Sequence, residues 1–267
     1  MRLAMPRFKL TIEYAGTRYS GWQIQKNART VAGEIDRAVR EVTGVREFEL
    51  YGAGRTDAGV HALAQVAHLD IRTNVPPASL LRRVNDELPA DINILRVAPA
   101  PHRFHARHTA VSRTYLYQVA TRRTAFGKPF VWWVREPLDV EAMRRAARRF
   151  EGMGDFASFT DDDPDEKSTK VAVTRVRLDE AGDLLLLRVE GSHFLWKMVR
   201  RMVGVLVAIG RGEVTPRELD QFMREPSTAP ARLTAPPSGL FLERVTYPGD
   251  PPSADAAPLL TLPSLGQ

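Results

Sequence analysis

The chain has no cysteine, which excludes disulfide bonds, thiolate metal sites and a cysteine nucleophile. It also lacks long hydrophobic runs: the most apolar stretch, 203–209, is far shorter than the roughly 20 residues that a transmembrane helix needs. The opening residues MRLAMPRFKL lack the apolar core of a signal peptide. We therefore expect a cytoplasmic protein without a membrane segment.

Basic residues outnumber acidic ones in an otherwise ordinary composition. The 267 residues include 38 Lys and Arg against 32 Asp and Glu, which gives a formal net charge of +6. Hydrophobic residues make up 43% of the chain, enough for a sizeable core in one large domain or two closely packed ones. The positive charge favours an anionic partner, with nucleic acid ahead of a membrane surface.

Hydrophobic periodicity in the first half predicts strands and helices in the order β-α-β-β-α-β. Alternating apolar and polar residues predict a half-buried strand over 7–14. The other expected elements are a helix capped by Thr30, strands over 48–51 and 65–71, a helix that Pro89 ends and a strand over 92–97. This order is that of the ferredoxin-like split unit.

The second half repeats this order of elements without a repeat of sequence. The expected elements are strands over 111–119, 171–178, 184–189 and 240–247, a helix capped by Asp139, a long helix over 194–209 and a short extra helix that starts at Thr215. The strand over 184–189 is apolar almost throughout, so we expect it in the centre of a sheet.

These patterns predict an α+β protein of two ferredoxin-like β-α-β-β-α-β halves that share a mainly antiparallel sheet, with helices on one face. We expect an N-terminal α+β half over 7–105, which carries the glycine-rich loop 52–61, and a C-terminal α+β half over 106–247. The Pro-, Ala- and Asp-rich residues 248–267 are expected to form a disordered tail.

The most informative segment is the loop 52–61, with the sequence GAGRTDAGVH, between two predicted strands. A dinucleotide-binding loop needs a third glycine where Asp57 stands, and a helix after it. A phosphate-binding loop needs Lys and then Ser or Thr where Val60 and His61 stand. The loop therefore fails both nucleotide-binding patterns at the residues that their chemistry requires.

The same loop presents Arg55 and Asp57 two residues apart on a turn that its glycines make possible. A bidentate contact from Arg55 can hold the Asp57 carboxylate in one orientation and keep it ionised, as a nucleophile or a base must be. The composition of the loop leaves two interpretations: a catalytic carboxylate, or a structural turn closed by a salt bridge.

Other motifs along the chain accompany this loop. They are GWQ at 21–23, NDELPADI at 85–92, FHAR at 104–107, RTYLY at 113–117, DFASF at 155–159, FLWKMVRRMVG at 194–204 and PSGLFLERVTY at 237–247. Together with the loop 52–61, and in this order, they resemble the TruA-type tRNA pseudouridine synthases. The resemblance extends over nearly the whole chain, from Phe8 to Tyr247.

The resemblance implies an isomerase that converts uridine to pseudouridine at positions 38, 39 and/or 40 of the tRNA anticodon stem-loop. In this family the N1–C1′ bond breaks, the uracil turns and C5 bonds to C1′, so no cofactor is needed. Asp57 matches the catalytic aspartate of the catalytic loop 52–61, which acts as a nucleophile at C1′ or removes a C2′ proton.

Arg55, Tyr115 and Arg200 match other active-site positions of the family. Tyr115 is expected to stack on the uracil or to help remove its C5 proton, and Arg200 to pair with Asp57 or with a phosphate. From the residues alone, Tyr115 also fits core packing on a strand, and Arg200 also fits a charge on a helix surface.

The resemblance further implies a homodimer that binds the anticodon arm of tRNA, without a metal and without a membrane partner. The RNA-binding candidates are the basic residues His105, Arg107, Arg122, Arg123, Lys128, Arg144 and Arg148, and Arg145 and Arg149 extend the last of these into a cluster on one predicted helix. That cluster equally fits a solvated helix face. His61 and His68 are expected to be structural rather than metal ligands.

Two other functions fit parts of the sequence. A non-catalytic RNA-binding module on this fold would keep the basic residues and lose the constellation around Asp57, which is present. A glycosidase or nucleosidase would use Asp57 with a second carboxylate as general acid. Asp70 and Asp86 are available for that role, but no paired motif stands out.

Overall fold

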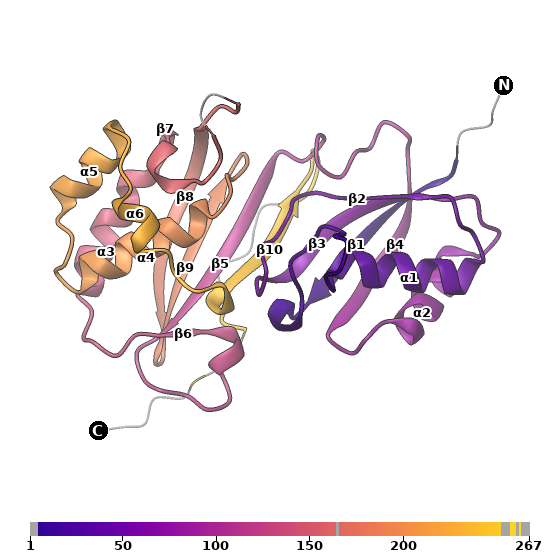
Figure 1. Cartoon of the computed structure of the whole chain (residues 1–267), viewed down its shortest axis with the longest axis horizontal. Coiled ribbons are helices and arrows are strands. Elements are labelled where there is room, and N and C mark those ends of the chain that lie inside the picture. Colours follow the sequence, from indigo (N-terminus) through magenta and orange to yellow (C-terminus); the bar gives the residue numbers. More distant parts are fainter. Residues whose placement is uncertain (1–4, 164–165, 252–256, 260–261, 263–267) are drawn as a thin grey trace. The chain divides into compact units, whose positions relative to one another are not determined.

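Strand β1 (Arg7–Tyr14) alternates buried and half-buried side chains along its whole length, as its sequence predicts. It lies between β3 (His61–Asp70) and β4 (Ile92–Ala100), antiparallel to both, in a computed structural model that describes residues 5–163, 166–251, 257–259 and 262 (Figure 1). Strand β2 (Glu49–Gly52) pairs with the last four residues of β3. These strands form the antiparallel part of the first half.

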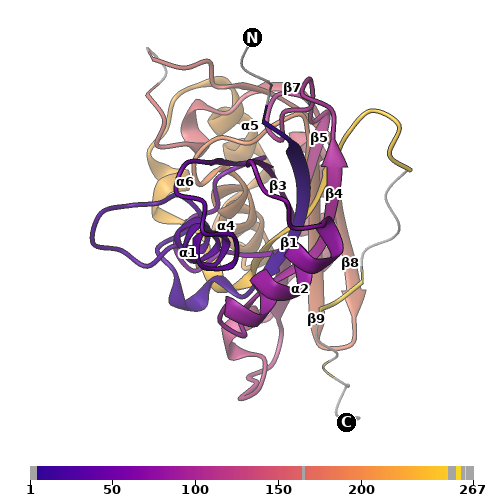
Figure 2. The same ribbon diagram turned by 90° about the vertical axis from the view of Figure 1, so that its right-hand side faces the viewer.

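Helices α1 (Val31–Thr43) and α2 (Pro77–Glu87) contact each other and lie on the same face of this sheet (Figures 1 and 2). Helix α1 begins where the Thr30 hydroxyl accepts a hydrogen bond from the Gly33 N–H at 3.2 Å, and it ends at Gly44, whose φ is +69°. The first half therefore has the predicted order β-α-β-β-α-β.

The second half has four antiparallel strands in the spatial order β5-β9-β8-β7. Their bounds are Ser112–Ala120 for β5, Gly152–Asp155 for β7, Lys170–Ala181 for β8 and Leu184–Gly191 for β9. The two-residue strand β6 (Trp132–Trp133) pairs in parallel with the end of β5. Because β9 has a partner on both edges, its predicted central position is confirmed.

Helix α4 (Met198–Gly210) forms much of the core of the second half, and twelve of its thirteen residues are buried. It packs against α3 (Val140–Ala147), while the shorter α5 (Pro216–Arg224) and α6 (Ala229–Arg232) follow it. The capping box predicted at Thr215 opens α5. Short 3-10 helices span Gly16–Arg18, Lys128–Phe130, Arg148–Phe150, Ala157–Phe159 and Pro237–Gly239.

The chain divides into two compact units, Met1–Val111 with Phe241–Asp250 and Ser112–Leu240 with Pro251–Gln267. The last strand, β10 (Leu240–Thr246), falls largely in the first unit because Phe241 and Leu242 pair in parallel with the start of β3. The division predicted between residues 105 and 106 stays a prediction.

The predicted α+β class with a mainly antiparallel sheet is confirmed. Two boundaries were wrong by four residues. The strand expected over 65–71 begins at His61. The helix expected from Phe194 begins at Met198, because Lys197 has a φ of +62°, which an α-helix does not accept. No helix within the described residues combines the length and hydrophobicity needed to cross a membrane.

Most of the predicted tail, 248–267, lies outside the described residues. In the part that the structure describes, the Leu259 N–H donates to the Gln118 side-chain oxygen at 2.8 Å, and Leu262 is buried.

Candidate active site

The loop 52–61 connects β2 to β3 in the first unit. Its central residue Thr56 is buried, whereas Asp57 is half-buried and Arg55 is exposed. The Thr56 hydroxyl lies 2.8 Å from the Tyr14 hydroxyl, which ties the loop to the end of β1. The inward-facing Thr56 thus helps to anchor the loop, while Arg55 and Asp57 on either side of it are less buried.

The segment 16–22, which follows β1, supports the main chain of this loop. The Trp22 N–H donates to the Thr56 carbonyl oxygen at 3.1 Å. Gly21 has a φ of +91°, and a Cβ built on it would lie 2.5 Å from that same oxygen, so only glycine fits there. The Gly-Trp pair of the GWQ motif therefore holds the peptide that immediately precedes Asp57.

Further hydrogen bonds fix the loop on both sides of the carboxylate. The Asp57 carbonyl oxygen accepts from the Val60 N–H at 3.1 Å, in a turn where Gly59 has a φ of +78°. The side-chain amide of Gln65, which is fully buried, donates to the Gly54 carbonyl oxygen at 3.0 Å. The carboxylate is therefore carried on a preorganised turn, as a catalytic group requires.

The expected contact between Arg55 and Asp57 is not formed. Within the described residues no ion pair joins these two side chains, and Arg55 extends into solvent. The reason is the inward-facing Thr56 between them, whose side chain and carbonyl oxygen are both held by earlier residues. A turn closed by an Arg–Asp salt bridge is therefore excluded, and Arg55 stays accessible to a ligand.

His61 and His68 have structural partners. The Nδ1 atom of His61 accepts from the Gly16 N–H at 3.0 Å, and that of His68 accepts from the Ala106 N–H at 3.2 Å. Burial, with a smaller effect of Arg7, lowers the pKa of His68 to about 4. Nowhere in the described residues do three His, Cys, Asp or Glu side chains gather as metal ligands would.

Tyr115 lies on β5 in the second unit and is half-buried. Its ring meets the ring of Phe194 edge-on, with 5.2 Å between the ring centres. Tyr117, two residues along the strand, is the tyrosine that packs in the core: it is fully buried and its hydroxyl donates to the Pro236 carbonyl oxygen at 2.7 Å. The half-buried Tyr115 therefore fits a ligand-binding side chain better than the fully buried Tyr117 does.

Arg200 lies on α4, also in the second unit, and is half-buried. Its Nε donates to the Ala235 carbonyl oxygen at 2.7 Å, and the Ala235 N–H donates back to the Arg200 carbonyl oxygen at 3.1 Å. Gly204 allows this approach, because a Cβ on it would lie 1.7 Å from the Leu233 carbonyl oxygen. Arg200 is thus an anchored guanidinium rather than a solvated charge on a helix surface.

Three supporting residues were missed from the sequence. Tyr14 and Thr56 form a buried hydrogen bond that holds the loop 52–61, and Phe194 packs against the ring of Tyr115. The motifs that contain Thr56 and Phe194 were visible, but nothing local distinguished their supporting role. Tyr14 carried only the alternation of its strand as a signal.

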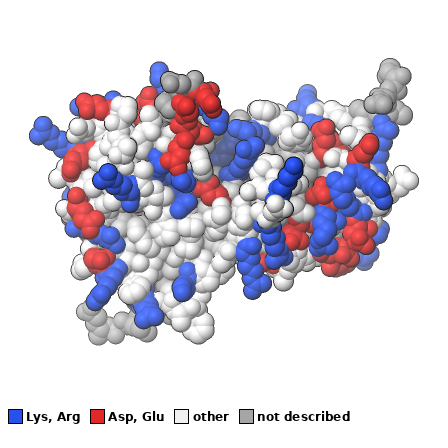
Figure 3. Space-filling view, in the orientation of Figure 1, with Lys and Arg blue, Asp and Glu red and all other residues white. Residues whose placement is uncertain are grey.

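The RNA-binding candidates differ in how far their charges are already engaged. Lys and Arg are interspersed with Asp and Glu over the face shown in Figure 3, so ion pairs decide which cations remain available. Arg122 pairs with Asp183 at 2.6 Å, whereas Arg123 and Lys128 are exposed. Burial and the nearby His108 lower the pKa of His105, whose Nδ1 accepts the Arg107 and His108 N–H groups. Arg107 itself is exposed.

The arginine cluster of α3 and the following turn divides into two classes. Arg144 pairs with Glu141 and Glu180, and Arg149 pairs with Asp220. Arg145 and Arg148 are exposed, and neither forms an ion pair within the described part of the chain. Arg145 and Arg148 therefore fit the RNA-binding interpretation of this face better than Arg144 and Arg149, whose charges are already paired.

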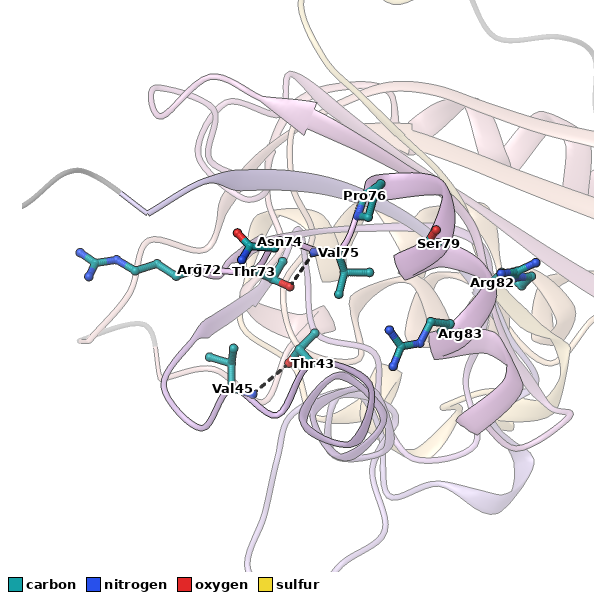
Figure 4. A pocket seen from close by; sticks show the side chains of 10 residues that line it. All are labelled: Thr43, Val45, Arg72, Thr73, Asn74, Val75, Pro76, Ser79, Arg82 and Arg83. Atoms are coloured by element: carbon teal, nitrogen blue, oxygen red, sulfur yellow. Dashed lines mark hydrogen bonds between the residues drawn. The ribbon is translucent and has the colours of Figure 1, made fainter.

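A cavity of about 550 Å³ in the first unit lies away from the loop 52–61. It is lined by Thr43, Val45, Arg72, Thr73, Asn74, Val75, Pro76, Ser79, Arg82 and Arg83. Figure 4 shows Arg72 and Arg82 pointing in opposite directions, and Arg83 donates to the Val42 carbonyl oxygen at 2.8 Å. The guanidinium groups do not converge on one ligand, and no carboxylate lines the cavity.

Comparison with known proteins bears on both units. A family model described as tRNA pseudouridine synthase matches residues 10–108 and 146–248. A protein of Nitrobacter hamburgensis named tRNA pseudouridine synthase A is 41% identical over 246 residues, which cover 91% of this chain and all of that protein. Proteins of the same name from Rhizobium meliloti and Thermoanaerobacter sp. are 39% and 36% identical, each over 91% of this chain and all of the relative.

Solved structures show a weaker likeness. A chain in the crystal structure of a Cbf5-Nop10-Gar1 complex is 12% identical, with a TM-score of 0.35, over 75% of this chain and 45% of that one. A chain in the archaeal box H/ACA sRNP Nop10-Cbf5 complex gives a TM-score of 0.33 at 10% identity.

Proposed function

The chain belongs to the tRNA pseudouridine synthase family, and from that premise we propose that it isomerises uridine to pseudouridine at one or more of positions 38, 39 and 40 of the tRNA anticodon stem-loop. One observation carries the activity: the part of this chain that matches the family model includes the loop 52–61 with Asp57. The relatives match this chain over their full lengths. The positions rest on the resemblance to the TruA type.

Asp57 acts at the sugar in this proposal. The N1–C1′ bond of the uridine breaks and C1′ bonds to C5 of the turned uracil. C5 then loses its proton and N1 gains one, so the product is an isomer of the substrate. The carboxylate either attacks C1′ or removes a proton from C2′, and in both cases it must be ionised and fixed in place. The hydrogen-bonded turn around Asp57 supplies the fixed position.

Tyr115 and Arg200 serve the substrate in this proposal. Tyr115 holds the detached uracil by stacking, because its ring is only half-buried and Phe194 supports it from one edge. Arg200 contributes a guanidinium whose orientation is set by its bond to Ala235, which suits a phosphate or a developing negative charge. The reaction is redox-neutral and needs no cofactor.

The phosphates of the anticodon arm are bound by exposed cations. Arg55, Arg123, Lys128, Arg145 and Arg148 are the strongest candidates, since each is exposed and none forms an ion pair within the described residues. Arg122 and Arg144 are weaker candidates because carboxylates already neutralise them.

The working form is proposed to be a cytoplasmic homodimer that binds one tRNA arm across both subunits. This part rests on the family resemblance. Sedimentation of the purified protein at micromolar concentration is expected to give twice the chain mass of 29.9 kDa. A monomeric mass would contradict it.

A tRNA labelled with tritium at C5 of uridine tests the reaction. An isomerase releases the tritium to water and leaves neither free uracil nor an abasic site. A glycosidase that uses Asp57 releases uracil with its tritium in place, and an RNA-binding module releases nothing. Mapping of pseudouridine in the product, and in tRNA from cells that lack the protein, then locates the target positions.

A further inference from the structure

Trp196 is a large aromatic residue that stands in solvent just before α4. Its exposed fraction is 51%, compared with 3% for Trp22. The ammonium group of Lys197 lies 4.7 Å from the centre of the indole ring. A single exposed aromatic residue is common on protein surfaces, so its surroundings decide whether it is a binding residue.

The backbone at Trp196 is fixed by a hydrogen bond and ion pairs that do not involve the indole ring. The Trp196 N–H donates to the Asp162 carboxylate at 3.0 Å, and Lys197 pairs with Asp161 at 2.6 Å. The buried Arg201 also pairs with Asp161, and the positive φ of Lys197 makes the chain turn sharply. Because the corner is already ordered, a ligand that binds the indole does not have to immobilise the backbone.

This corner also carries the residue that contacts Tyr115. Phe194, two residues before Trp196, packs edge-on against Tyr115, and Arg200 follows in the first turn of α4. In the proposed function Tyr115 holds the target uracil. Trp196 is therefore an exposed aromatic residue in the segment that joins Phe194, which packs on Tyr115, to Arg200.

We propose that Trp196 stacks on the base of a nucleotide next to the target uridine in the tRNA. This inference rests on the proposed function. When the target leaves the base stack, the neighbouring bases lose a stacking partner, and an indole ring can replace it whatever the identity of the base.

Affinity for tRNA tests the proposal. Trp196→Ala is expected to weaken binding roughly five- to 150-fold, as removal of one stacked base does, while Trp196→Phe keeps most of the affinity. The dependence of affinity on salt is expected to be unchanged, because no cation is removed. A 2-aminopurine beside the target uridine is expected to lose fluorescence on binding the wild type and to keep it with Trp196→Ala.

Two exposed aromatic residues of the same unit provide matched controls. Phe126 is 95% exposed, and Trp133 is 41% exposed with the Arg123 guanidinium 6.0 Å from its ring centre. Phe126→Ala and Trp133→Ala are expected to bind tRNA within two-fold of the wild type. Circular dichroism of Trp196→Ala is expected to match the wild type, since the ring is not part of the core.

Several outcomes would overturn the proposal. The first is that Trp196→Ala binds tRNA as tightly as the wild type, and the second is that Trp196→Phe loses as much affinity as Trp196→Ala. The third is that the two control variants lose as much affinity as Trp196→Ala. The fourth is that 2-aminopurine keeps its fluorescence when the wild type binds. A changed sedimentation mass of free Trp196→Ala with unchanged RNA affinity would make Trp196 a protein interface instead. A wild-type protein that binds tRNA without releasing tritium defeats the proposed function, whereas a loss of affinity in Trp196→Ala would still support the stacking contact.

Discussion

Gly21 lies directly against Thr56: a Cβ built on Gly21 would be 2.5 Å from the Thr56 carbonyl oxygen. The neighbouring Trp22 donates its N–H to that oxygen at 3.1 Å, and Asp57 is the next residue along the chain. The position of the proposed catalytic carboxylate thus depends on the absence of a side chain at Gly21, in the segment before α1.

We expect Gly21→Ala to lower kcat at least ten-fold and to leave tRNA affinity within about three-fold. The added methyl group displaces the Thr56 peptide, and a misplaced catalytic group is costly, whereas the RNA-binding cations are untouched. The φ of +91° adds strain of about 1–2 kcal/mol, which a folded protein tolerates. Single-turnover kinetics and filter binding separate the two effects.

Two other glycines control for the Gly21 experiment. Gly54 is in the same loop, and Gly44 shares the positive φ; a Cβ on either would have no heavy atom within 4 Å. Gly54→Ala and Gly44→Ala are expected to keep nearly full activity. If Gly44→Ala lost as much activity as Gly21→Ala, backbone strain rather than displacement of the loop would be the cause.

Asp57→Asn is expected to abolish isomerisation and to leave tRNA binding nearly intact, because one carboxylate does the chemistry while many cations provide affinity. Tritium release from labelled tRNA measures the first and filter binding the second. Asp86→Asn, at an exposed position of α2, is the control and is expected to be fully active. Turnover by Asp57→Asn above a tenth of the wild-type value would refute the assignment.

Tyr115→Phe is expected to keep much more activity than Tyr115→Ala, because the phenyl ring retains both the stacking surface and the contact with Phe194. A loss of ten-fold or more in the alanine variant, with at most a few-fold loss in the phenylalanine variant, is the anticipated pattern in single-turnover assays. Equal and severe losses would instead assign the proton transfer at C5 to the hydroxyl group.

The arginine cluster can be tested by comparing its two classes. The double variant Arg145→Gln/Arg148→Gln is expected to weaken tRNA binding and to reduce the slope of log K against log salt by about 1.8, since each lost phosphate contact contributes about 0.9. Arg144→Gln/Arg149→Gln removes the same charge from groups paired with Glu180 and Asp220 and is expected to change the slope little. If both variants kept the wild-type slope, the solvated-face interpretation would be restored.

Because the pKa of His68 is lowered in the folded protein, we expect the protein to lose stability in mild acid. Its pKa is lowered from 6.5 in the unfolded chain to about 4 in the folded one, chiefly by burial, so the unfolded chain binds more protons between these values. The stability that His68 contributes is complete above pH 6.5 and is lost as the pH falls toward 4. One proton changes the unfolding free energy by at most about 1.4 kcal/mol per pH unit.

Urea unfolding between pH 4 and 7 measures this effect. His68→Asn can still accept the Ala106 N–H and is expected to show a shallower decline than the wild type. His102→Asn, at an exposed position, is expected to follow the wild-type curve. Parallel curves for the wild type and His68→Asn would show that other groups, such as the adjacent His105, set the acid response.

Local sequence determined those features whose causes lie within a few residues. The alternation in β1, the Thr30 cap of α1 and the capping box at Thr215 were all predicted and are present, because each depends on neighbours along the chain. The ordered motifs, including the loop around Asp57, were likewise sufficient to predict the family.

Only the tertiary structure decided which charged groups meet. Proximity in sequence predicted a contact between Arg55 and Asp57, but Tyr14, from another strand, holds the residue between them inward and leaves Arg55 in solvent. Arg144 and Arg148 look equivalent in the sequence, yet Glu180, from a distant strand, pairs with the first alone. Spacing along the chain sets local geometry, whereas burial and ion pairing depend on residues that only folding brings together.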